Sequence, residues 1–261
     1  MRLTPNALYK KKRREKITAL TAYDFPFAAI LDRAGVDLIL VGDSLGMVLL
    51  GYENTLPVTM EDMIHHTKAV SRAAKRGLVA ADMPYHSYNT PAQAVSNAKQ
   101  LLEAGAQAVK LEGGGKIEKQ IRALVQKKIP VIGHLGMTPQ SVKQLGGYKV
   151  QGREKKQADQ ILKDALLLDK AGVFALVLEC IPAGLGAEIT RAVKCPTIGI
   201  GAGPDTDGQI LVLHDMLGFE GKVHPRFVRR YASIEEDAFR AIENYREDVL
   251  AGKFPLKEES Y

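Results

Sequence analysis

The sequence is short of cysteine, tryptophan and long apolar runs, and each shortage argues against a class of protein. Among 261 residues there are two cysteines and no tryptophan. Cys180 and Cys195 lie in strand-like contexts without metal-binding spacing, and two cysteines are too few for a disulfide scaffold. We therefore expect reduced thiols in a cytoplasmic protein. No apolar run approaches the ~18 residues that a membrane-spanning helix needs, so we expect no membrane partner.

Basic residues outnumber acidic ones, 36 to 30, and residues 10–14 read KKKRR. Such a run is one way in which proteins bind nucleic acid. However, aromatic residues make up only 6% of the chain, and we find neither zinc-finger spacing nor an aromatic RNA-binding strand. The run is also not followed by the apolar stretch of a secretory signal. We expect residues 1–16 to be a short, solvated basic segment, and we expect no nucleic-acid partner.

Beyond residue 16, short β-branched runs alternate with longer segments of helical periodicity. The short runs are apolar on both faces, which is typical of parallel strands covered by helices. Seven or eight such units in roughly 200 residues predict an α/β fold, a (βα)8 TIM barrel, with an open doubly wound sheet as the alternative. The expected strands are 17–24, 37–43, 77–84, 108–114, 129–136, 174–180, 195–203 and 208–215, the last of which could equally be a short helix.

Capping residues mark the expected helix boundaries. Thr90, Pro91 and Gln93 form an N-cap, a first-turn proline and a reciprocal glutamine, which predicts that two backbone N–H groups are capped by side chains. Thr138 and Pro139 repeat the N-cap and proline. Three glycines stand where a helix C-terminus needs a left-handed residue. They are Gly35, Gly105 and Gly172.

No linker or change in composition divides the chain, so we expect one domain over residues 1–261 that closes with an amphipathic helix at about 233–254. Two connections, 44–58 and 137–155, are too long for plain turns. Loops longer than ~12–15 residues in a compact domain are usually functional. Both connections follow the carboxyl end of a strand. We expect residues 144–153 to form a lid hinged at Gly146 and Gly147.

Acidic residues recur where the expected strands end. In a parallel barrel all strands run the same way, so their carboxyl ends meet on the face that holds the active site. Carboxylates crowded there repel one another and lose hydration unless a cation compensates them. A set rich in oxygen ligands, without cysteine or a histidine pair, favours Mg²⁺, whereas a helix N-cap or turn is the alternative for any single residue. The candidates are Asp24, Asp43, Asp82, Glu112, His134 and Glu179.

Lys110 adds a positive charge to this set. It precedes Glu112 by two residues, so both side chains are expected on the same face of their strand. A lysine that points into the barrel mouth needs an anionic partner. That partner is either Glu112, in a structural salt bridge, or the carboxylate of a substrate.

Eight segments, in the expected order, resemble those of the ketopantoate hydroxymethyltransferase family. They span residues 21–215, which is nearly all of the expected barrel. Eight segments in one order are far more specific than any one of them. The segments are TAYD, VGDSLGM, TLPVT, KLEGG, GHLGMTPQS, GGYKVQGR, LVLEC and GIGAG…TDGQILVLHD.

The resemblance implies a (βα)8 barrel, assembled as a homodecamer, that acts in pantothenate biosynthesis. The implied reaction transfers a hydroxymethyl group from 5,10-methylenetetrahydrofolate to the 2-oxo acid 3-methyl-2-oxobutanoate, giving 2-dehydropantoate, with Mg²⁺ as cofactor. Matched position by position, Asp43 and Asp82 look like the metal ligands, with Glu112 reaching the metal directly or through water. Glu179 looks like the catalytic base. The implied substrate-binding residues are Asp43, Ser44, Asp82 and Lys110.

The expected chemistry fits these residue types. A 2-oxo acid can chelate Mg²⁺ through a carboxylate oxygen and its keto oxygen, and the metal then stabilises the enolate formed when the C3 proton leaves. The main alternative is a Mg²⁺-dependent lyase of the phosphoenolpyruvate mutase/isocitrate lyase type, which also binds 2-oxo acids in such a barrel. The absence of cysteine from residues 137–153 argues against a lyase with a cysteine acid.

Overall fold

The computed structural model describes residues 2–142, 146–219 and 225–261. The chain divides into two compact units, Met1–Val212 and Leu213–Tyr261. The first unit contains every strand of the described chain and the helices between them. The organisation of 1–261 as a single domain stays a prediction.

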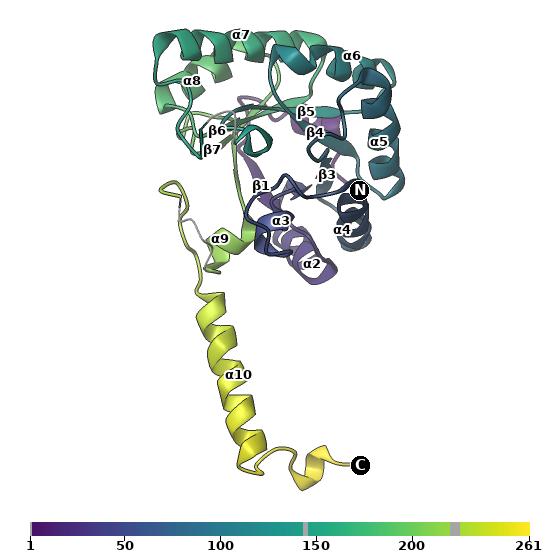
Figure 1. Cartoon of the computed structure of the whole chain (residues 1–261), viewed down its shortest axis with the longest axis vertical. Coiled ribbons are helices and arrows are strands. Elements are labelled where there is room, and N and C mark those ends of the chain that lie inside the picture. Colours follow the sequence, from purple (N-terminus) through teal and green to yellow (C-terminus); the bar gives the residue numbers. More distant parts are fainter. Residues whose placement is uncertain (1, 143–145, 220–224) are drawn as a thin grey trace. The chain divides into compact units, whose positions relative to one another are not determined.

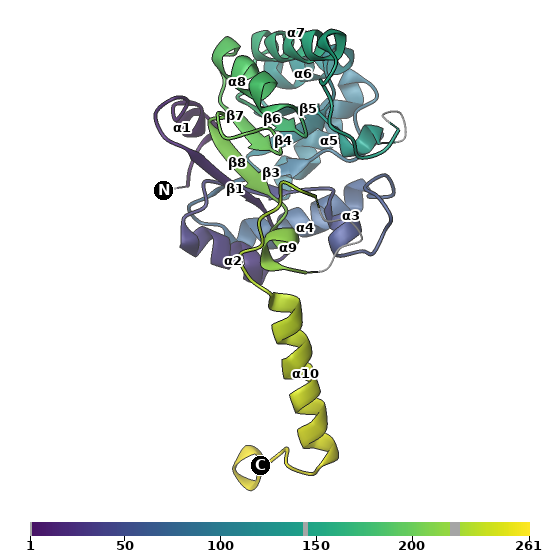
Figure 2. The ribbon, with the colours of Figure 1, turned by 90° about the vertical axis from the view of Figure 1, so that its left-hand side faces the viewer.

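The first unit is a closed barrel of eight parallel strands in chain order, with β8 pairing back to β1 (Figures 1 and 2). The helices between the strands lie outside the barrel, which confirms the predicted (βα)8 fold. All eight expected strands are present, and each is shorter than predicted because its flanking residues belong to loops or, after β8, to a short helix. The strands are β1 Ile17–Thr21, β2 Leu38–Val41, β3 Leu78–Asp82, β4 Ala108–Glu112, β5 Val131–Gly136, β6 Ala175–Glu179, β7 Thr197–Ile200 and β8 Gly208–Leu211.

Helices connect the strands from β1 to β7, whereas β7 and β8 are joined by a loop, and short helical turns break up the two long connections. The 44–58 connection contains α3, and the 137–155 connection begins with the 3₁₀ turn η2. The elements are α1 Pro5–Tyr9, α2 Phe25–Ala34, α3 Leu45–Val48, α4 Met60–Ala73, α5 Pro91–Glu103, η1 Gly115–Ile117, α6 Glu118–Gln126, η2 Pro139–Ser141, α7 Lys155–Ala171 and α8 Ala183–Ala192.

The three glycines predicted at helix ends adopt the left-handed conformation. Gly35 and Gly172 are the C-caps of α2 and α7, with φ of 81° and 100°. Gly105 follows the end of α5 with φ of 106°. A side chain at this backbone conformation would be strained, so glycine is the residue that ends the helix and lets the chain turn into the next strand.

The two predicted N-caps differ in outcome. Thr90 Oγ1 accepts the N–H of Gln93 at 3.2 Å, as expected for α5. The Gln93 side chain, however, accepts the N–H of Asn89 at 2.9 Å, so the reciprocal cap lies one residue earlier than predicted. Thr138 precedes η2 and its side chain makes no capping bond within the described chain, because the following residues form a 3₁₀ turn and not an α-helix.

The barrel interior is apolar and is extended by the N-terminal helix. Leu8 of α1 is fully buried in the same cluster as the inward side chains of the strands. Burial of this helix explains why the N-terminal segment is held to the barrel. Interior members of the cluster include Ile17, Leu38, Leu78, Ile132, Val177 and Ile198.

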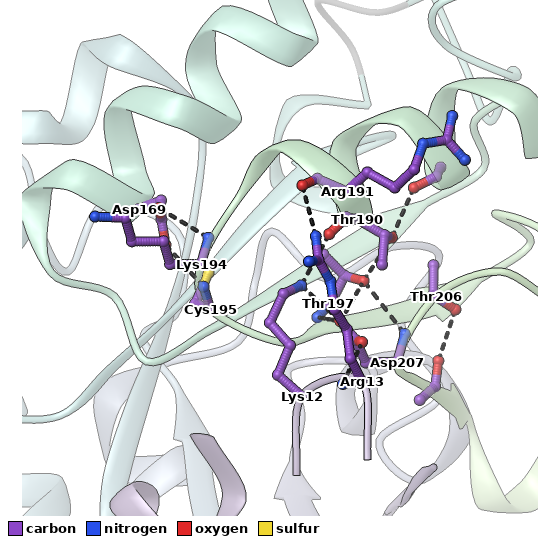
Figure 3. Close-up of polar contacts among 12 residues, drawn as sticks. Lys12, Arg13, Asp169, Thr190, Arg191, Lys194, Cys195, Thr197, Thr206 and Asp207 are labelled. Atoms are coloured by element: carbon purple, nitrogen blue, oxygen red, sulfur yellow. Dashed lines mark hydrogen bonds and ion pairs between the residues drawn. The ribbon is translucent and has the colours of Figure 1, made fainter. Parts of the chain in front are cut away.

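The basic run before β1 is solvated only in part: Lys10, Arg13 and Arg14 are exposed, as predicted, whereas Lys11 and Lys12 are bound to the barrel. Lys11 Nζ pairs with Asp37 Oδ1 at 2.6 Å, and Lys12 Nζ pairs with Asp207 Oδ2 at 2.9 Å. The backbone N–H of Arg13 donates to Asp207 Oδ1 at 3.1 Å (Figure 3). Asp37 and Asp207 immediately precede β2 and β8, so these basic residues have partners at the amino ends of the strands.

The second unit begins with α9, Leu213–Leu217. The expected strand 208–215 therefore resolves into both of the structures considered for it, β8 followed by a short helix. The predicted terminal helix is confirmed as α10, Ile234–Leu250, which Ser233 precedes as N-cap residue; η3, Lys257–Glu259, follows it. Among the described residues, no helix combines the length and the apolar character needed to cross a membrane.

Candidate active site

The carboxyl ends of β2 to β6 bring the predicted polar residues together on one face of the barrel. Asp82, Glu112 and Glu179 are the last residues of their strands. His134 lies within β5 and Asp43 lies two residues beyond β2. Strand register aligns neighbouring members of the set: Asp82 is opposite Lys110, and Glu112 is opposite His134.

Asp43, Asp82 and Lys110 form the first part of the site. The backbone N–H of Asp43 donates to Asp82 Oδ2 at 3.0 Å, and Lys110 Nζ donates to Asp82 Oδ1 at 2.5 Å. The second anion near Lys110 is Glu112, with Oε1 3.6 Å from Nζ. Burial lowers the pKa of Lys110, but the charges of Asp82 and Glu112 outweigh it and raise the pKa above its ordinary value. Lys110 therefore stays charged.

Asp43 is the least compensated carboxylate of the site. Its side chain is 2% exposed. Burial and the negative charges of Asp82 and Glu112 hold its pKa well above the ordinary range, and Lys110 offsets this only in part. Gln140 Nε2 donates to Asp43 Oδ2 at 2.7 Å, while Oδ1 accepts no hydrogen bond from any residue that the structure describes.

Glu112, His134 and Glu179 form the second part. His134 Nδ1 lies 3.2 Å from Glu112 Oε1, and its Nε2 lies 3.1 Å from Glu179 Oε2. Burial would lower the pKa of His134, but Glu112 and Glu179 raise it to about 9, so the imidazole is protonated at neutral pH. Glu179 is the more accessible partner, with 13% of its side chain exposed against 2% for His134. The carboxylate of Glu179 therefore faces the opening.

Ser44 lies beside this group, at the turn after β2. Its Oγ is 2.8 Å from the phenol oxygen of the buried Tyr23. The turn is tight: a Cβ on Gly42 would lie 2.9 Å from Ser44 Oγ and 3.5 Å from Asp82 Oδ2. Glycine at this position lets the backbone pass close to both polar side chains.

Asp24 caps a helix, which is the alternative considered for any single acidic residue at the end of a strand. Strand β1 ends at Thr21, and Asp24 is the N-cap of α2, where its Oδ1 accepts the N–H of Phe27 at 2.8 Å. An aspartate before a helix satisfies an otherwise unpaired N–H group. Asp24 therefore caps the helix, and any further part that it plays in the site stays a prediction.

Two residues of the site were not predicted, the buried Gln140 and the partly buried Tyr88. Besides its bond to Asp43, Gln140 donates its backbone N–H to Glu112 Oε2 at 3.0 Å. The Tyr88 hydroxyl donates to Gln140 Oε1. Gln140 lies within the segment GHLGMTPQS, one of the eight on which the resemblance rests, and this was the signal that could have identified it.

The described part of the predicted lid lies near the site. Residues 144 and 145 fall outside the described chain; Gly146 and Gly147 have φ of 69° and 107°, left-handed values that suit glycine hinges. Tyr148 Oη is 3.6 Å from the sulfur of Met47 on the 44–58 connection. Burial and then the charge of Glu179 raise the pKa of Tyr148, which places its phenol within the field of the site. Closure of the lid stays a prediction.

The charges of the site fit a divalent cation. Counted in their ionised forms, Asp43, Asp82, Glu112 and Glu179 carry four negative charges and Lys110 and His134 carry two positive ones, an excess of two negative charges, and the raised pKa of Asp43 reflects this excess. Within the described residues, no three His, Cys, Asp or Glu side chains are already arranged as a metal site. The oxygens of Glu112 are taken by His134, Lys110 and Gln140. The free Oδ1 of Asp43 and the adjacent Asp82 are thus the groups best placed to hold a cation.

Solved structures with a similar barrel are found among enzymes of other names. A phosphonopyruvate hydrolase solved in complex with oxalate and Mg²⁺ has a TM-score of 0.66 and 13% identity, covering 98% of this chain and 93% of its own. A 2,3-dimethylmalate lyase of the phosphoenolpyruvate mutase/isocitrate lyase superfamily has a TM-score of 0.64 and 17% identity, covering 100% and 93%. At these identities the likeness shows the fold alone.

Sequence relatives are much closer. The family model for ketopantoate hydroxymethyltransferase matches residues 2–257. The 3-methyl-2-oxobutanoate hydroxymethyltransferase of Thermoanaerobacter pseudethanolicus is 60% identical over 253 residues, covering 96% of this chain and 92% of the relative. The enzyme of that name from Moorella thermoacetica is 56% identical, covering 98% and 96%. The chain therefore belongs to the ketopantoate hydroxymethyltransferase family.

Proposed function

We propose that this protein transfers a hydroxymethyl group from 5,10-methylenetetrahydrofolate to 3-methyl-2-oxobutanoate, giving 2-dehydropantoate. The names of relatives up to 60% identical support this reaction. The structural observation that carries it is the connected set of buried ionisable groups at the barrel mouth, with its excess of two negative charges. Such a set suits an anionic substrate only together with a cation.

Asp43 and Asp82 are the proposed ligands of Mg²⁺, and Glu112 reaches it through water, because both of its oxygens already accept hydrogen bonds or pair with a cation. Hard oxygen donors of this kind are the ligands that Mg²⁺ prefers. When bound, Mg²⁺ would supply a Lewis acid for the carboxylate and keto oxygens of the 2-oxo acid.

Lys110 and Ser44 are the proposed substrate-binding side chains, together with Asp43 and Asp82. Lys110 is buried and charged, and its ammonium group can balance the substrate carboxylate while it stays bonded to Asp82. The hydroxyl of Ser44 is held by Tyr23 at 2.8 Å, which orients it beside the turn after β2. These contacts would fix the 2-oxo acid in one orientation over the site.

Glu179 is the proposed base that removes the C3 proton. Its carboxylate is the most accessible of the ion-paired groups at the mouth, and His134 Nε2, 3.1 Å away, limits its orientation. A base must lie within hydrogen-bonding reach of the proton that it takes. Deprotonation at C3 gives the carbon nucleophile that attacks the one-carbon unit of the folate, and a lid over residues 146–153 would exclude water during that step.

The proposed assembly is a homo-oligomer, a decamer by resemblance to the family, in the cytoplasm. Helix α10 lies wholly within the described residues and buries none of them in the single chain. Both cysteines are free, which agrees with a reducing compartment. The helix exposes the apolar side chains of Phe239, Ile242, Tyr245, Val249 and Leu250, which a partner chain could cover. The molar mass from light scattering tests the assembly.

Proton exchange at C3 tests the proposed chemistry without the folate. Wild-type protein with Mg²⁺ and 3-methyl-2-oxobutanoate in deuterated water should lose the C3–H signal in the NMR spectrum. Glu179→Gln should abolish the exchange, whereas Glu188→Gln, the same change at an exposed position of α8, should leave it intact. Wild-type protein without Mg²⁺-dependent exchange would overturn the proposal, and exchange retained in Glu179→Gln would remove that residue from the role.

A Mg²⁺-dependent lyase is the second candidate, favoured only by the shared barrel fold. A panel of 2-oxo acids and their adducts, assayed with and without methylenetetrahydrofolate, separates the two activities. Product formation that requires the folate supports the transferase. Cleavage of a carbon–carbon or carbon–phosphorus bond without the folate would support the lyase.

A further inference from the structure

Gln140 is a buried residue that contacts several parts of the site at once. It lies in the middle of η2, after β5, and is 4% exposed. Its Nε2 donates to Asp43 Oδ2 at 2.7 Å and to the backbone oxygen of Met83 at 2.9 Å. The two amide hydrogens are therefore both used. One side chain connects the turn after β2 to the residue that follows β3.

The orientation of this amide is determined by its surroundings. Its Oε1 accepts from the hydroxyl of Tyr88, which also lies 3.3 Å from the backbone oxygen of Glu112. The Tyr88 hydroxyl has one hydrogen to donate, and both oxygens near it are acceptors. Exchanging the oxygen and nitrogen of the amide would set its oxygen against Asp43 and the Met83 carbonyl, two acceptors. The Gln140 amide thus presents its N–H to Asp43.

The Gln140 amide fixes the orientation of the Asp43 carboxylate. Because Oδ2 accepts from Gln140, rotation of the carboxylate would break a charge-assisted hydrogen bond in a buried place, which is costly. Oδ1 is left as the oxygen without a hydrogen-bond partner in the described chain. The backbone N–H of Gln140 donates to Glu112 Oε2 at 3.0 Å. Two of the three proposed metal-site carboxylates are therefore oriented by one residue.

We propose that Gln140 is a positioning residue of the cation site, which holds Asp43 so that Oδ1 is presented to the metal and holds Glu112 back from it. The inference rests on the proposed function, since it supposes a divalent cation at Asp43 and Asp82. Groups that orient metal ligands contribute to affinity without touching the metal, and their loss lowers affinity about 10- to 100-fold. Gln140 acts on the metal through Asp43.

Direct metal binding by Gln140→Met tests the inference. Methionine has a similar length and keeps the backbone N–H to Glu112, but it removes the side-chain bonds to Asp43, Met83 and Tyr88. Mn²⁺ binding is measured by electron paramagnetic resonance in the absence of substrate. We expect the affinity to fall about 10- to 100-fold relative to wild type. In the Mg²⁺-dependent assay, the Mg²⁺ concentration for half activity should rise while kcat at saturating Mg²⁺ falls less.

Gln120→Met is the matched control. Gln120 is also buried, at 8% exposed, and its Nε2 lies 3.2 Å from the backbone oxygen of Tyr88, but it contacts none of the site carboxylates. It should lose stability to a similar degree and keep the wild-type affinity for Mn²⁺. Equal losses of affinity in Gln140→Met and Gln120→Met would show that the effect is merely structural and would overturn the inference.

Tyr88→Phe keeps the inference testable if Gln140→Met does not fold. It removes only the hydroxyl that orients the amide, and Mn²⁺ affinity should fall by a smaller factor, about threefold to tenfold. Unchanged affinity in a folded Tyr88→Phe, or in a folded Gln140→Met, would overturn the inference. Wild-type protein that binds no Mn²⁺ would instead overturn the proposed cation site, so the two failures are distinguishable.

Discussion

The carboxylates at the two ends of the barrel are compensated in opposite ways. At the amino ends of the strands, Asp37 is paired with Lys11, and Asp207 is paired with Lys12 and accepts the N–H of Thr197. At the carboxyl ends, four carboxylates share two cationic side chains. At the amino ends, the carboxylates are balanced by basic residues of the same chain. At the carboxyl ends, negative charge remains that a bound ligand would have to balance.

The pKa directions express the same difference. Burial raises the pKa of Asp207, but the Thr197 N–H and Lys12 outweigh it and hold the pKa below its ordinary value. For Asp43, burial and the neighbouring Asp82 act in the same direction and raise the pKa well above it. A carboxylate that stabilises the fold has partners that favour its charged form, whereas a carboxylate that awaits a ligand lacks them. This contrast distinguishes the mouth of the barrel from its opposite end.

Glu179→Gln should have the largest effect of any change that leaves the fold intact. Loss of the base should lower kcat for hydroxymethyl transfer by about 10²- to 10⁴-fold. Steady-state kinetics measure it, and urea unfolding should give nearly the wild-type free energy. A variant with full activity would show that the mouth does not use this carboxylate.

Lys12→Met should have the converse effect at the opposite end. Its side chain is 10% exposed and that of Asp207 is 4% exposed, so the change leaves a buried carboxylate without its cation. We expect the free energy of unfolding to fall by about 3 kcal/mol, with kcat of the folded enzyme unchanged. A large loss of kcat with unchanged stability would show that Lys12 serves activity and not the fold, which contradicts the difference between the two ends.

Asp43→Asn should stabilise the metal-free protein while it inactivates the enzyme. Asparagine can still accept from Gln140, and the change removes one negative charge from a crowded set. The free energy of unfolding in EDTA should rise by about 1 kcal/mol, the equivalent of roughly one pKa unit. A clear loss of stability in EDTA would mean that the mouth is not under electrostatic strain.

The pH dependence should have opposite signs at the two ends. The pKa of Asp207 is depressed, so the stability that it contributes is present above its unfolded value of 3.8 and is lost as pH falls through its folded pKa. The pKa of Asp43 is raised, so its contribution is full below 3.8 and is lost as pH rises through its folded pKa. Urea unfolding of wild type, Asp207→Asn and Asp43→Asn across pH, in EDTA, measures both. The same sign for both residues would contradict the comparison.

Much of this arrangement could be predicted from the sequence because it depends on local patterns. Asp82, Glu112 and Glu179 were identifiable because each ends an apolar run, and Lys110 because it alternates with Glu112 along a strand. The role of Asp24 could not be decided from the sequence, because the chain leaves the barrel three residues earlier, and a residue that follows a strand can equally cap the next helix.

The remaining features depend on contacts between distant segments. The closest anion to Lys110 is Asp82 on the neighbouring strand, a pairing set by strand register and not by spacing along the chain. Gln140 reaches Asp43 across 97 positions, and Lys12 reaches Asp207 across 195. Neither pairing leaves a periodic signal in the sequence, so the fold had to be known before they could be found.

We infer that a divalent cation balances the negative charge left uncompensated at the mouth of the barrel. Thermal unfolding of wild type, Asp43→Asn and Lys12→Met, each with EDTA and with saturating Mg²⁺, tests it most directly. A ligand at about 100 times its dissociation constant stabilises the folded state by about 2.7 kcal/mol. We predict that Mg²⁺ raises the unfolding temperature of wild type and Lys12→Met by similar amounts and leaves Asp43→Asn unchanged. An equal response in all three proteins, or none in wild type, would contradict the account.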